Sequence, residues 1–291
     1  MSALAGLFGY VLNYLYNYVQ NYGLAIILFS ILLKLILLPL TIKQQTSMKK
    51  NSKVQEEIKK LQLKYKNNPE MLNKEVMEIY KREKVSPFSG CLSSILQLVI
   101  FISVFYLISR PLTFMKKVDT GIIDSYKQEI RDKGQASNYE EIRVIELKSS
   151  EDEKVYLNMN FLGLDLSKVP MQNWKDVKVF IIPLLYIVTT FINIKLSTNL
   201  TNPKKKEEDK EVEVVDKDKD DNKKETQEEQ LESMQQMTKS MNYMMPIMSV
   251  AIALVAPLGL SLYWFVTNVL QLIERFTINF FMKKKEQEEA K

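Results

Sequence analysis

The run from Tyr22 to Thr41 limits most strongly what this chain can fold into, because it is apolar over the length of a membrane-spanning helix. Its one ionisable side chain is Lys34. A helix rises about 1.5 Å per residue, so Lys34 lies about 18 Å from Tyr22, inside an apolar layer of about 30 Å. A cation there costs about 3 kcal/mol on insertion scales and is usually functional. Two interpretations remain open: Lys34 faces a hydrated intramembrane cavity, or its ammonium extends along the helix toward the nearer interface.

Composition places the whole chain among membrane proteins. Apolar residues make up 46% of the 291 residues, yet they alternate with densely charged blocks, a pattern of membrane spans and aqueous loops. The sequence has no His and a single Cys, Cys91, which excludes a disulfide framework, a zinc cluster and a Cys/His nucleophile pair. We therefore expect no enzymatic activity, no cofactor and no metal site.

Apolar blocks, loop charges and turn residues divide the chain into predicted segments. The N-terminal residues lack the pattern of a signal peptide and are expected to remain. Their Leu12, Leu15 and Val19 share one helical face, and the expected interfacial anchors are Tyr10, Tyr14, Tyr16, Tyr18 and Tyr22. The predicted parts are an interfacial amphipathic helix (1–21), a first span (22–41), a cytoplasmic helical hairpin (42–88), a second span (89–110), an extracytoplasmic cap (111–177), a third span (178–197), a charged disordered cytoplasmic loop (198–240), a fourth span (241–256), a turn (257–259), a fifth span (260–282) and a cytoplasmic tail (283–291).

Loop charge orients these segments in the membrane. Residues 43–84 carry twelve Lys or Arg against six Glu, which places this loop in the cytoplasm by the positive-inside rule. The N-terminus is then outside and the C-terminus cytoplasmic. Asn67, Asn68 and Pro69 separate two stretches with apolar residues at helical spacing, which predicts a helical hairpin. The hairpin has no aromatic stacking platform, so no nucleic-acid partner is expected. In the cap we expect one helix and one β-hairpin, with the strands around the charged turn in RVIELKSSEDEKVYLNM.

Polar side chains recur at spacings of three and four residues within the predicted spans, and such residues share one face of a helix. They are Ser89, Ser93 and Gln97 in the second span, Tyr186, Thr190, Asn193 and Ser197 in the third, and Ser261, Trp264, Asn268, Gln271 and Arg275 in the fifth. We expect these faces to meet in a hydrated groove with Lys34 as the only deep charge. No Asp or Glu lies in the run that contains Lys34, so the sequence predicts an unpaired cation.

Four stretches resemble the YidC/Oxa/Alb family of membrane protein insertases in its short bacterial form. They are YGLAIILFSILLKLILLPLTIKQ, EIYKREKVSPFSGCLSSILQ, NFLGLDLS and MNYMMPIM…PLGLSLYWFVTNVLQLIE. The resemblance covers the spans and the hairpin, which is most of the chain apart from the cap and the Lys/Glu-rich loop. It implies an all-α polytopic protein of the bacterial plasma membrane, with five transmembrane helices around a hydrophilic groove that is open to the cytoplasm and to lipid. It also implies that the cytoplasmic hairpin receives the substrate.

The resemblance also implies roles for individual residues. The groove arginine of the family falls on Lys34, its second-span glutamine on Gln97, and its Tyr-Trp pair on Tyr263 and Trp264. Lysine lacks the planar fork of arginine, which weakens any mechanism that needs a bidentate grip on a carboxylate. Together with the polar faces, this gives a predicted substrate-contacting groove of Lys34, Ser30, Gln97, Thr190, Asn193, Tyr263, Trp264 and Asn268.

The implied activity is insertion of membrane proteins, by the protein alone or with the Sec translocon. The hydrophilic flank of a nascent membrane protein would cross through the groove, aided by water and one positive charge, and its hydrophobic segment would enter lipid. The implied partners are nascent membrane proteins, membrane lipids, the Sec translocon and the ribosome. A structural assembly factor or a small-solute transporter is the alternative, although a transporter would be expected to show internal repeats and paired ionisable residues. Removal of an unpaired Lys34 should leave the protein folded, since it relieves a desolvation cost.

Overall fold

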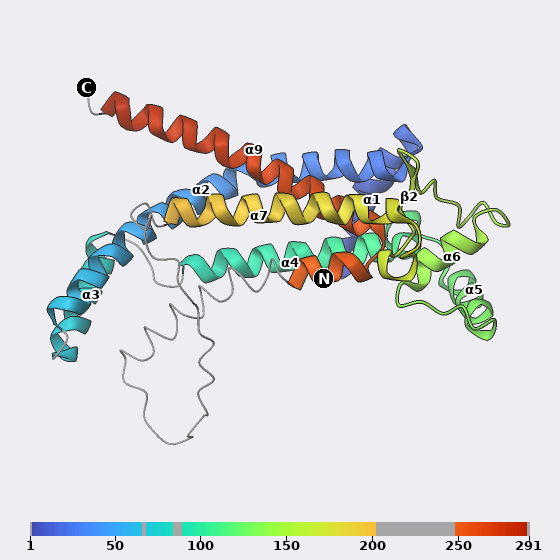
Figure 1. Ribbon diagram of the computed structural model, residues 1–291, viewed down its shortest axis with the longest axis horizontal. Helices are drawn as coiled ribbons and strands as arrows, with labels where there is room; N and C mark the ends of the chain where they lie inside the picture. The colour runs from blue at the N-terminus through green and yellow to red at the C-terminus, as the bar shows by residue number, and fades with distance from the viewer. Residues whose placement is uncertain (1, 66–67, 84–88, 202–247, 290–291) are drawn as a thin grey trace, which may run out of the picture. The chain divides into compact units, whose positions relative to one another are not determined.

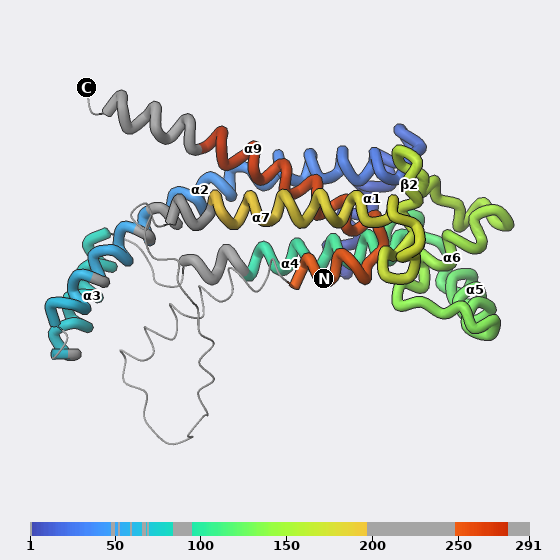
Figure 2. Tube along the Cα trace, viewed as in Figure 1, coloured from blue at the N-terminus to red at the C-terminus, as the bar shows by residue number. Residues whose placement is uncertain are grey.

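The computed structural model describes residues 2–65, 68–83, 89–201 and 248–289 (Figures 1 and 2). The predicted loop 198–240 and the first part of the predicted fourth span therefore lie almost entirely outside the described residues. The chain divides into two compact units. The larger unit consists of Met1–Ile42, Ser93–Asn193 and Ile247–Lys291, and the smaller of Lys43–Leu92 and Ile194–Pro246.

Long apolar helices build most of the larger unit. They are α1 (Ser2–Val19), α2 (Tyr22–Lys64), α4 (Ser89–Ser109), α7 (Ile181–Thr201) and α9 (Leu258–Glu289), of which α2, α4 and α7 continue into the smaller unit. Residues 248–255 form a further helical segment before Pro257. The windows Tyr22–Ser47 and Val177–Leu196 are long and apolar enough to cross a membrane. The described residues are thus mostly helical, as an all-α membrane protein requires, while the number of spans stays a prediction.

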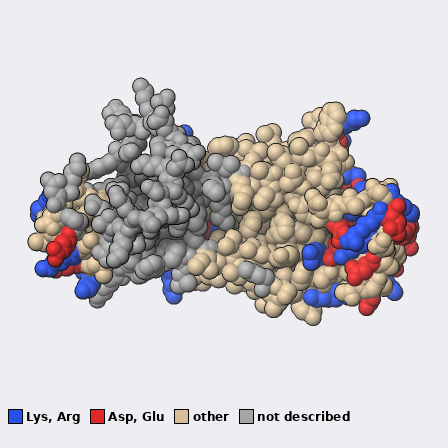
Figure 3. Space-filling view, turned by 90° about the horizontal axis from the view of Figure 1, so that it is seen from below, with Lys and Arg blue, Asp and Glu red and all other residues tan. Residues whose placement is uncertain are grey.

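The surface of these helices is apolar where it is exposed. Ile36, Phe191 and Phe276 are large, apolar and more than half exposed. In Figure 3 the Lys, Arg, Asp and Glu side chains of the larger unit gather over the cap, and the adjoining surface of this unit is almost free of them. An extended apolar surface of this kind is expected where helices face lipid.

The first helix contradicts part of the tyrosine prediction. Tyr16 and Tyr22 are buried core residues and not interfacial anchors, whereas Tyr10, Tyr14 and Tyr18 are exposed. The Tyr16 hydroxyl accepts a hydrogen bond from the Asn158 amide of the cap at 3.0 Å, and α1 also packs closely on the short π-helix η1 (Leu112–Lys116). The approach is so close that a Cβ at Gly9 would lie 1.9 Å from the Phe114 carbonyl oxygen, so this position requires glycine.

The cap contains more helix than the sequence indicated. Its elements are α5 (Thr120–Asp132), α6 (Glu140–Lys148), β1 (Asn160–Phe161), β2 (Leu164–Asp165) and the 3-10 helices η2 (Pro170–Gln172) and η3 (Val177–Phe180). The predicted strand at RVIEL is wrong, because these residues belong to α6, which buries Ile142 and Ile145 on one helical face. The β-hairpin lies further along the chain, where Leu162 and Gly163 both have positive φ in a tight turn.

Backbone hydrogen bonds join the cap to the beginnings of two long helices. The Tyr22 amide donates to the Asn158 carbonyl at 3.0 Å, and the Leu258 and Gly259 amides donate to the Lys168 and Leu166 carbonyls at 2.9 and 3.0 Å. The first amides of a helix have no partner within it, so the cap supplies acceptors for α2 and α9. Figure 1 shows the cap elements α5, α6 and β2 gathered near the beginning of α7.

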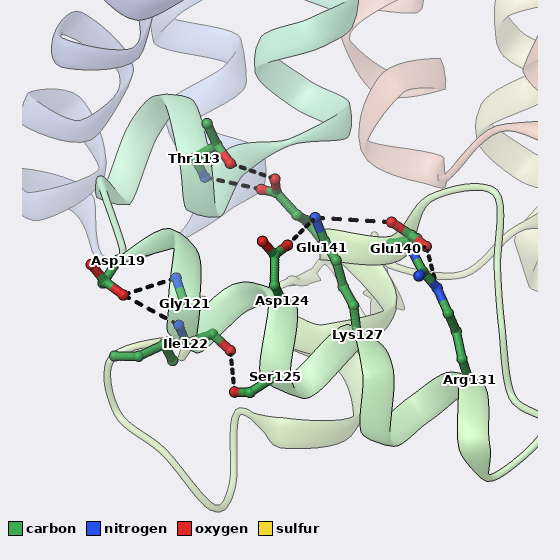
Figure 4. Close-up of polar contacts among 10 residues, drawn as sticks. All are labelled: Thr113, Asp119, Gly121, Ile122, Asp124, Ser125, Lys127, Arg131, Glu140 and Glu141. Carbon is green, nitrogen blue, oxygen red and sulfur yellow. Dashed lines mark hydrogen bonds and ion pairs between the residues drawn. The ribbon is translucent and has the colours of Figure 1, made fainter.

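Polar contacts hold the cap together internally (Figure 4). The buried carboxylate of Glu141 accepts hydrogen bonds from the Thr113 amide at 3.0 Å and from the Thr113 hydroxyl at 2.6 Å. Arg131 of α5 donates from Nε to Glu140 of α6 at 2.9 Å. Asp119 caps the beginning of α5 through the Gly121 amide at 2.9 Å.

Acid should weaken this cap. Hydrogen bonds from Lys133 and Lys148 lower the pKa of Glu129 to about 2. Burial alone would raise the pKa of Glu146, but hydrogen bonds from Lys168 and Arg143 lower it. A carboxyl group with a depressed folded pKa stabilises the fold above its unfolded value, and this contribution is lost as the pH falls through the folded pKa.

We therefore expect faster amide hydrogen exchange in residues 120–155, after correction for intrinsic rates, as the pH falls from about 5 to about 2. Glu129→Gln should flatten this dependence, because glutamine does not titrate. An equally steep dependence in that variant would show that Glu129 contributes nothing to it.

The smaller unit contains the end of α2 and α3 (Pro69–Arg82). The Asn68 side chain accepts a hydrogen bond from the Met71 amide at 3.1 Å, and Pro69 is the first residue of α3. The apolar residues that pack between the two helices are Val54, Ile58, Leu72, Val76, Ile79 and Tyr80. The turn thus coincides with the Asn-Pro pair singled out in the sequence, and the cytoplasmic location stays a prediction.

Candidate functional site

Lys34 forms an ion pair with Glu274 of α9, in which Nζ lies 2.6 Å from Oε2. The side chain of Glu274 is 4% exposed and that of Lys34 is 25% exposed. The expectation of an unpaired cation is therefore wrong. Ionised side chains among apolar helices are usually paired, since each charge alone has a large desolvation cost.

The two helices that carry this pair begin side by side at the cap. A Cβ at Gly259 of α9 would lie 3.6 Å from the Tyr22 ring at the start of α2. From these starts, Lys34 is about 18 Å along α2 and Glu274 about 24 Å along α9. The helices thus run in the same direction, and the ion pair lies well away from the cap.

Lys34 is the cation in direct contact with the Glu274 carboxylate. Apart from the ion pair with Lys34, no described residue is hydrogen-bonded to the carboxylate oxygens of Glu274, so the close approach of Lys34 compensates much of its charge. The neighbouring Arg275 also interacts electrostatically with Glu274, and it donates from Nη1 to the Asn193 carbonyl at 3.2 Å. A carboxylate that is this buried depends on the cation in direct contact with it, which is Lys34.

The polar faces of α7 and α9 meet each other. The Asn268 side chain donates to the Thr190 hydroxyl at 2.7 Å, and the Asn193 side chain donates to the Asn268 carbonyl at 3.1 Å. Thr190 and Asn193 are buried, while Asn268 is partly buried. These predicted groove residues therefore form an interhelical seam, although the buried Asn193 Oδ1 accepts no hydrogen bond from a described residue.

Aromatic rings surround Trp264, which is 4% exposed. The Phe101 ring stacks on Trp264 at 5.7 Å between centroids, and the Tyr186 ring lies at 5.8 Å with a tilt of 36°. The Tyr186 hydroxyl donates to Ser249 at 2.5 Å. Trp264 thus packs against residues of both α4 and α7. Sequence analysis predicted substrate contact for Trp264 and did not predict this packing role.

The remaining predicted groove residues are distributed differently. Ser30 is buried and donates to the Ile26 carbonyl of its own helix at 2.7 Å. Tyr263 is buried in the core, and Gln97 is exposed on α4. Ser89, Ser93 and Ser197 are outside the residues whose side chains are described. The structure therefore brings together Thr190, Asn193 and Asn268, and the joint groove stays a prediction.

Glu274 is the residue that sequence analysis missed. It is the only carboxylate between Leu258 and Met282, which could have marked it as a partner for Lys34. The helical face chosen from the sequence passed through Arg275 instead, since both residues fit a spacing from Gln271. The contact between Lys34 and Glu274 joins segments that are far apart in the chain, and residue spacing within one helix does not reveal such a contact.

Two cavities of the larger unit lie at the cap. One of about 430 Å3 is lined by residues such as Arg143, Glu146 and Lys168, and one of about 180 Å3 by residues such as Arg110 and Glu141. Neither is lined by Lys34 or Glu274. The arrangement around Lys34 offers ion pairing and hydrogen bonding, the chemistry of holding or passing a polar segment among apolar helices.

Long apolar helices with exposed apolar surfaces, two of which are long enough to cross a membrane, are consistent with an all-α membrane protein. A sequence profile of the 60Kd inner membrane protein family matches residues 14–286. The chain belongs to this family, which is the YidC/Oxa/Alb family, and the resemblance found in the sequence is confirmed.

Bacterial relatives include three proteins named membrane protein insertase YidC. The Clostridium perfringens protein is 28% identical over 91% of this chain and 82% of its own length. The Fusobacterium nucleatum protein is 44% identical over 33% of this chain, and that of Francisella tularensis subsp. novicida is 44% identical over 37%. These two alignments cover 47% and 20% of the relatives' own lengths.

Proposed function

We propose that this protein is a membrane protein insertase of the bacterial plasma membrane. It moves the hydrophilic flank of a nascent membrane protein across the apolar layer and releases the hydrophobic segment into lipid. Family membership and the names of the relatives support this activity. The proposed partners are nascent membrane proteins and membrane lipids, with the Sec translocon and the ribosome as further partners.

The observation that carries the proposal is the ion pair of Lys34 and Glu274 among helices with an exposed apolar surface. A membrane protein with only a structural task has little reason to keep two charges at this depth, because apolar residues would pack there at lower cost. Charges and amide groups at this depth lower the free-energy barrier to moving a polar flank through the apolar layer, because they act where this barrier is highest. The reaction needs no covalent step.

The topology completes the proposal. Five spans with the N-terminus outside place the cap outside and the hairpin of α2 and α3 in the cytoplasm, where a nascent chain emerges. The basic character of residues 43–84 supports this orientation. The polar residues Lys34, Gln97 and Asn193 would line a groove that is open toward the cytoplasm.

Reconstitution tests the activity directly. We expect liposomes that contain the purified protein to insert a single-span test protein, so that protease added outside no longer removes its translocated flank. Liposomes without protein, and liposomes with an unrelated polytopic protein, are the controls. Equal protection in all three would contradict the proposal.

A small-solute transporter or a structural assembly factor would behave differently in the same vesicles. A transporter would leave the test protein unprotected and would move solutes. An assembly factor would act only when other membrane components are present. Insertion by the protein alone therefore separates the proposed activity from both alternatives.

A further inference from the structure

The positive charge that the sequence places in the membrane is balanced in the folded protein. Lys34 Nζ and Glu274 Oε2 are 2.6 Å apart, so the pair presents a dipole rather than a net charge. The attraction of a dipole for an approaching charge is weaker than that of a single cation and falls faster with distance. An acidic flank therefore does not meet Lys34 as a free cation.

Glu274 also competes for the same ammonium. A carboxylate on a substrate must displace Glu274 or share the three donors of Lys34 with it. Displacement leaves a carboxylate that is 4% exposed without its ion-pair partner, and no other described residue is hydrogen-bonded to it. Sharing brings two like charges together. Because α2 and α9 hold the pair in place, Glu274 acts at a high effective concentration.

We propose that Glu274 is a specificity-determining residue of the insertase, which neutralises Lys34 and thereby disfavours substrates with acidic translocated flanks. The inference rests on the proposed function and adds the class of substrate that the site selects. With Glu274 in place, the protein favours flanks that are polar but uncharged. Without the negative charge of Glu274, the same site would favour acidic flanks.

Other charges nearby do not take over this role. Arg275 is committed to the Asn193 carbonyl on α7 and adds positive charge, which opposes the effect of Glu274. Among the described residues of the larger unit, the other buried carboxylate, Glu141, lies in the cap and accepts from Thr113. Glu141→Gln is therefore the matched control for loss of a buried carboxylate.

The test measures insertion of two single-span proteins that differ only in the flank, one with two Asp and one with two Asn. We expect Glu274→Gln to raise the acidic-to-neutral ratio of inserted protein about fivefold over the parent. The double variant Lys34→Gln/Glu274→Gln should return to the ratio of the parent, since the cation at position 34 is then gone and Arg275 is the same in all variants. Glu141→Gln should keep the parental ratio.

The outcomes separate the inference from the proposed function. An unchanged ratio in Glu274→Gln, or an equal change for both substrates, would show a purely structural ion pair and overturn the inference while insertion itself stands. A raised ratio that persists in the double variant would assign the effect to something other than Lys34 and would also overturn it. If the parent inserts neither substrate, the proposed function falls, and the inference with it. Melting temperatures of all variants show that the compared proteins are folded.

Discussion

Lys34→Ala is expected to lower the free energy of unfolding by about 3 kcal/mol, because it leaves the Glu274 carboxylate buried without its cation. This reverses the expectation from the sequence, in which removal of an unpaired cation would relieve a desolvation cost. The sign of the effect thus depends on one contact between α2 and α9. Unfolding by denaturant in mixed micelles, followed by circular dichroism, measures the change.

Two variants serve as controls for this prediction. Adding Glu274→Gln to Lys34→Ala should restore most of the lost stability, since an uncharged amide has a much smaller desolvation cost. Lys43→Ala removes an exposed lysine from the same helix and should change stability by less than about 0.5 kcal/mol. Wild-type stability in Lys34→Ala would mean that water or lipid headgroups solvate Glu274 and that the ion pair is dispensable.

Local sequence signals predicted local structure well in this protein. The Asn68-Pro69 pair lies at the beginning of α3, and the apolar residues on both sides of it are the ones that pack in the smaller unit. The same kind of reasoning was wrong at RVIEL, because β-branched residues favour strands only weakly and burial of Ile142 and Ile145 on one face favoured a helix. Tyr16 and Tyr22 show a similar error, since tyrosine is common at membrane interfaces and in cores.

The site was less accessible to sequence reasoning than the helices. Helical spacing identified Thr190, Asn193 and Asn268, which bond to one another across α7 and α9. It did not identify the partner of Lys34, because Glu274 lies on a distant helix and spacing within one helix says nothing about which helices are neighbours. A charge in an apolar run is therefore best analysed together with every opposite charge in the other apolar runs, however distant.

Trp264→Ala is expected to have an effect as large as that of Lys34→Ala. Trp264 stacks on Phe101 of α4 and lies beside Tyr186 of α7, so its removal leaves a cavity where three helices meet. Substitution of a buried tryptophan by alanine typically costs about 3 to 5 kcal/mol, and the lost ring stacking adds to the effect of the cavity. We therefore expect a loss of about 3 kcal/mol or more in the same unfolding measurement.

The chain offers a matched control, because its only other tryptophan, Trp174, is 67% exposed. Trp174→Ala should change stability by less than about 0.5 kcal/mol. Each of the two variants leaves one tryptophan, so its fluorescence can be measured alone. Trp264 in the Trp174→Ala protein should emit at shorter wavelength and resist a water-soluble quencher. Trp174 in the Trp264→Ala protein should be quenched readily. If Trp264→Ala were as stable as Trp174→Ala but lost insertion activity, the residue would contact substrate, as the family resemblance implies, and the packing of α4, α7 and α9 would not depend on it.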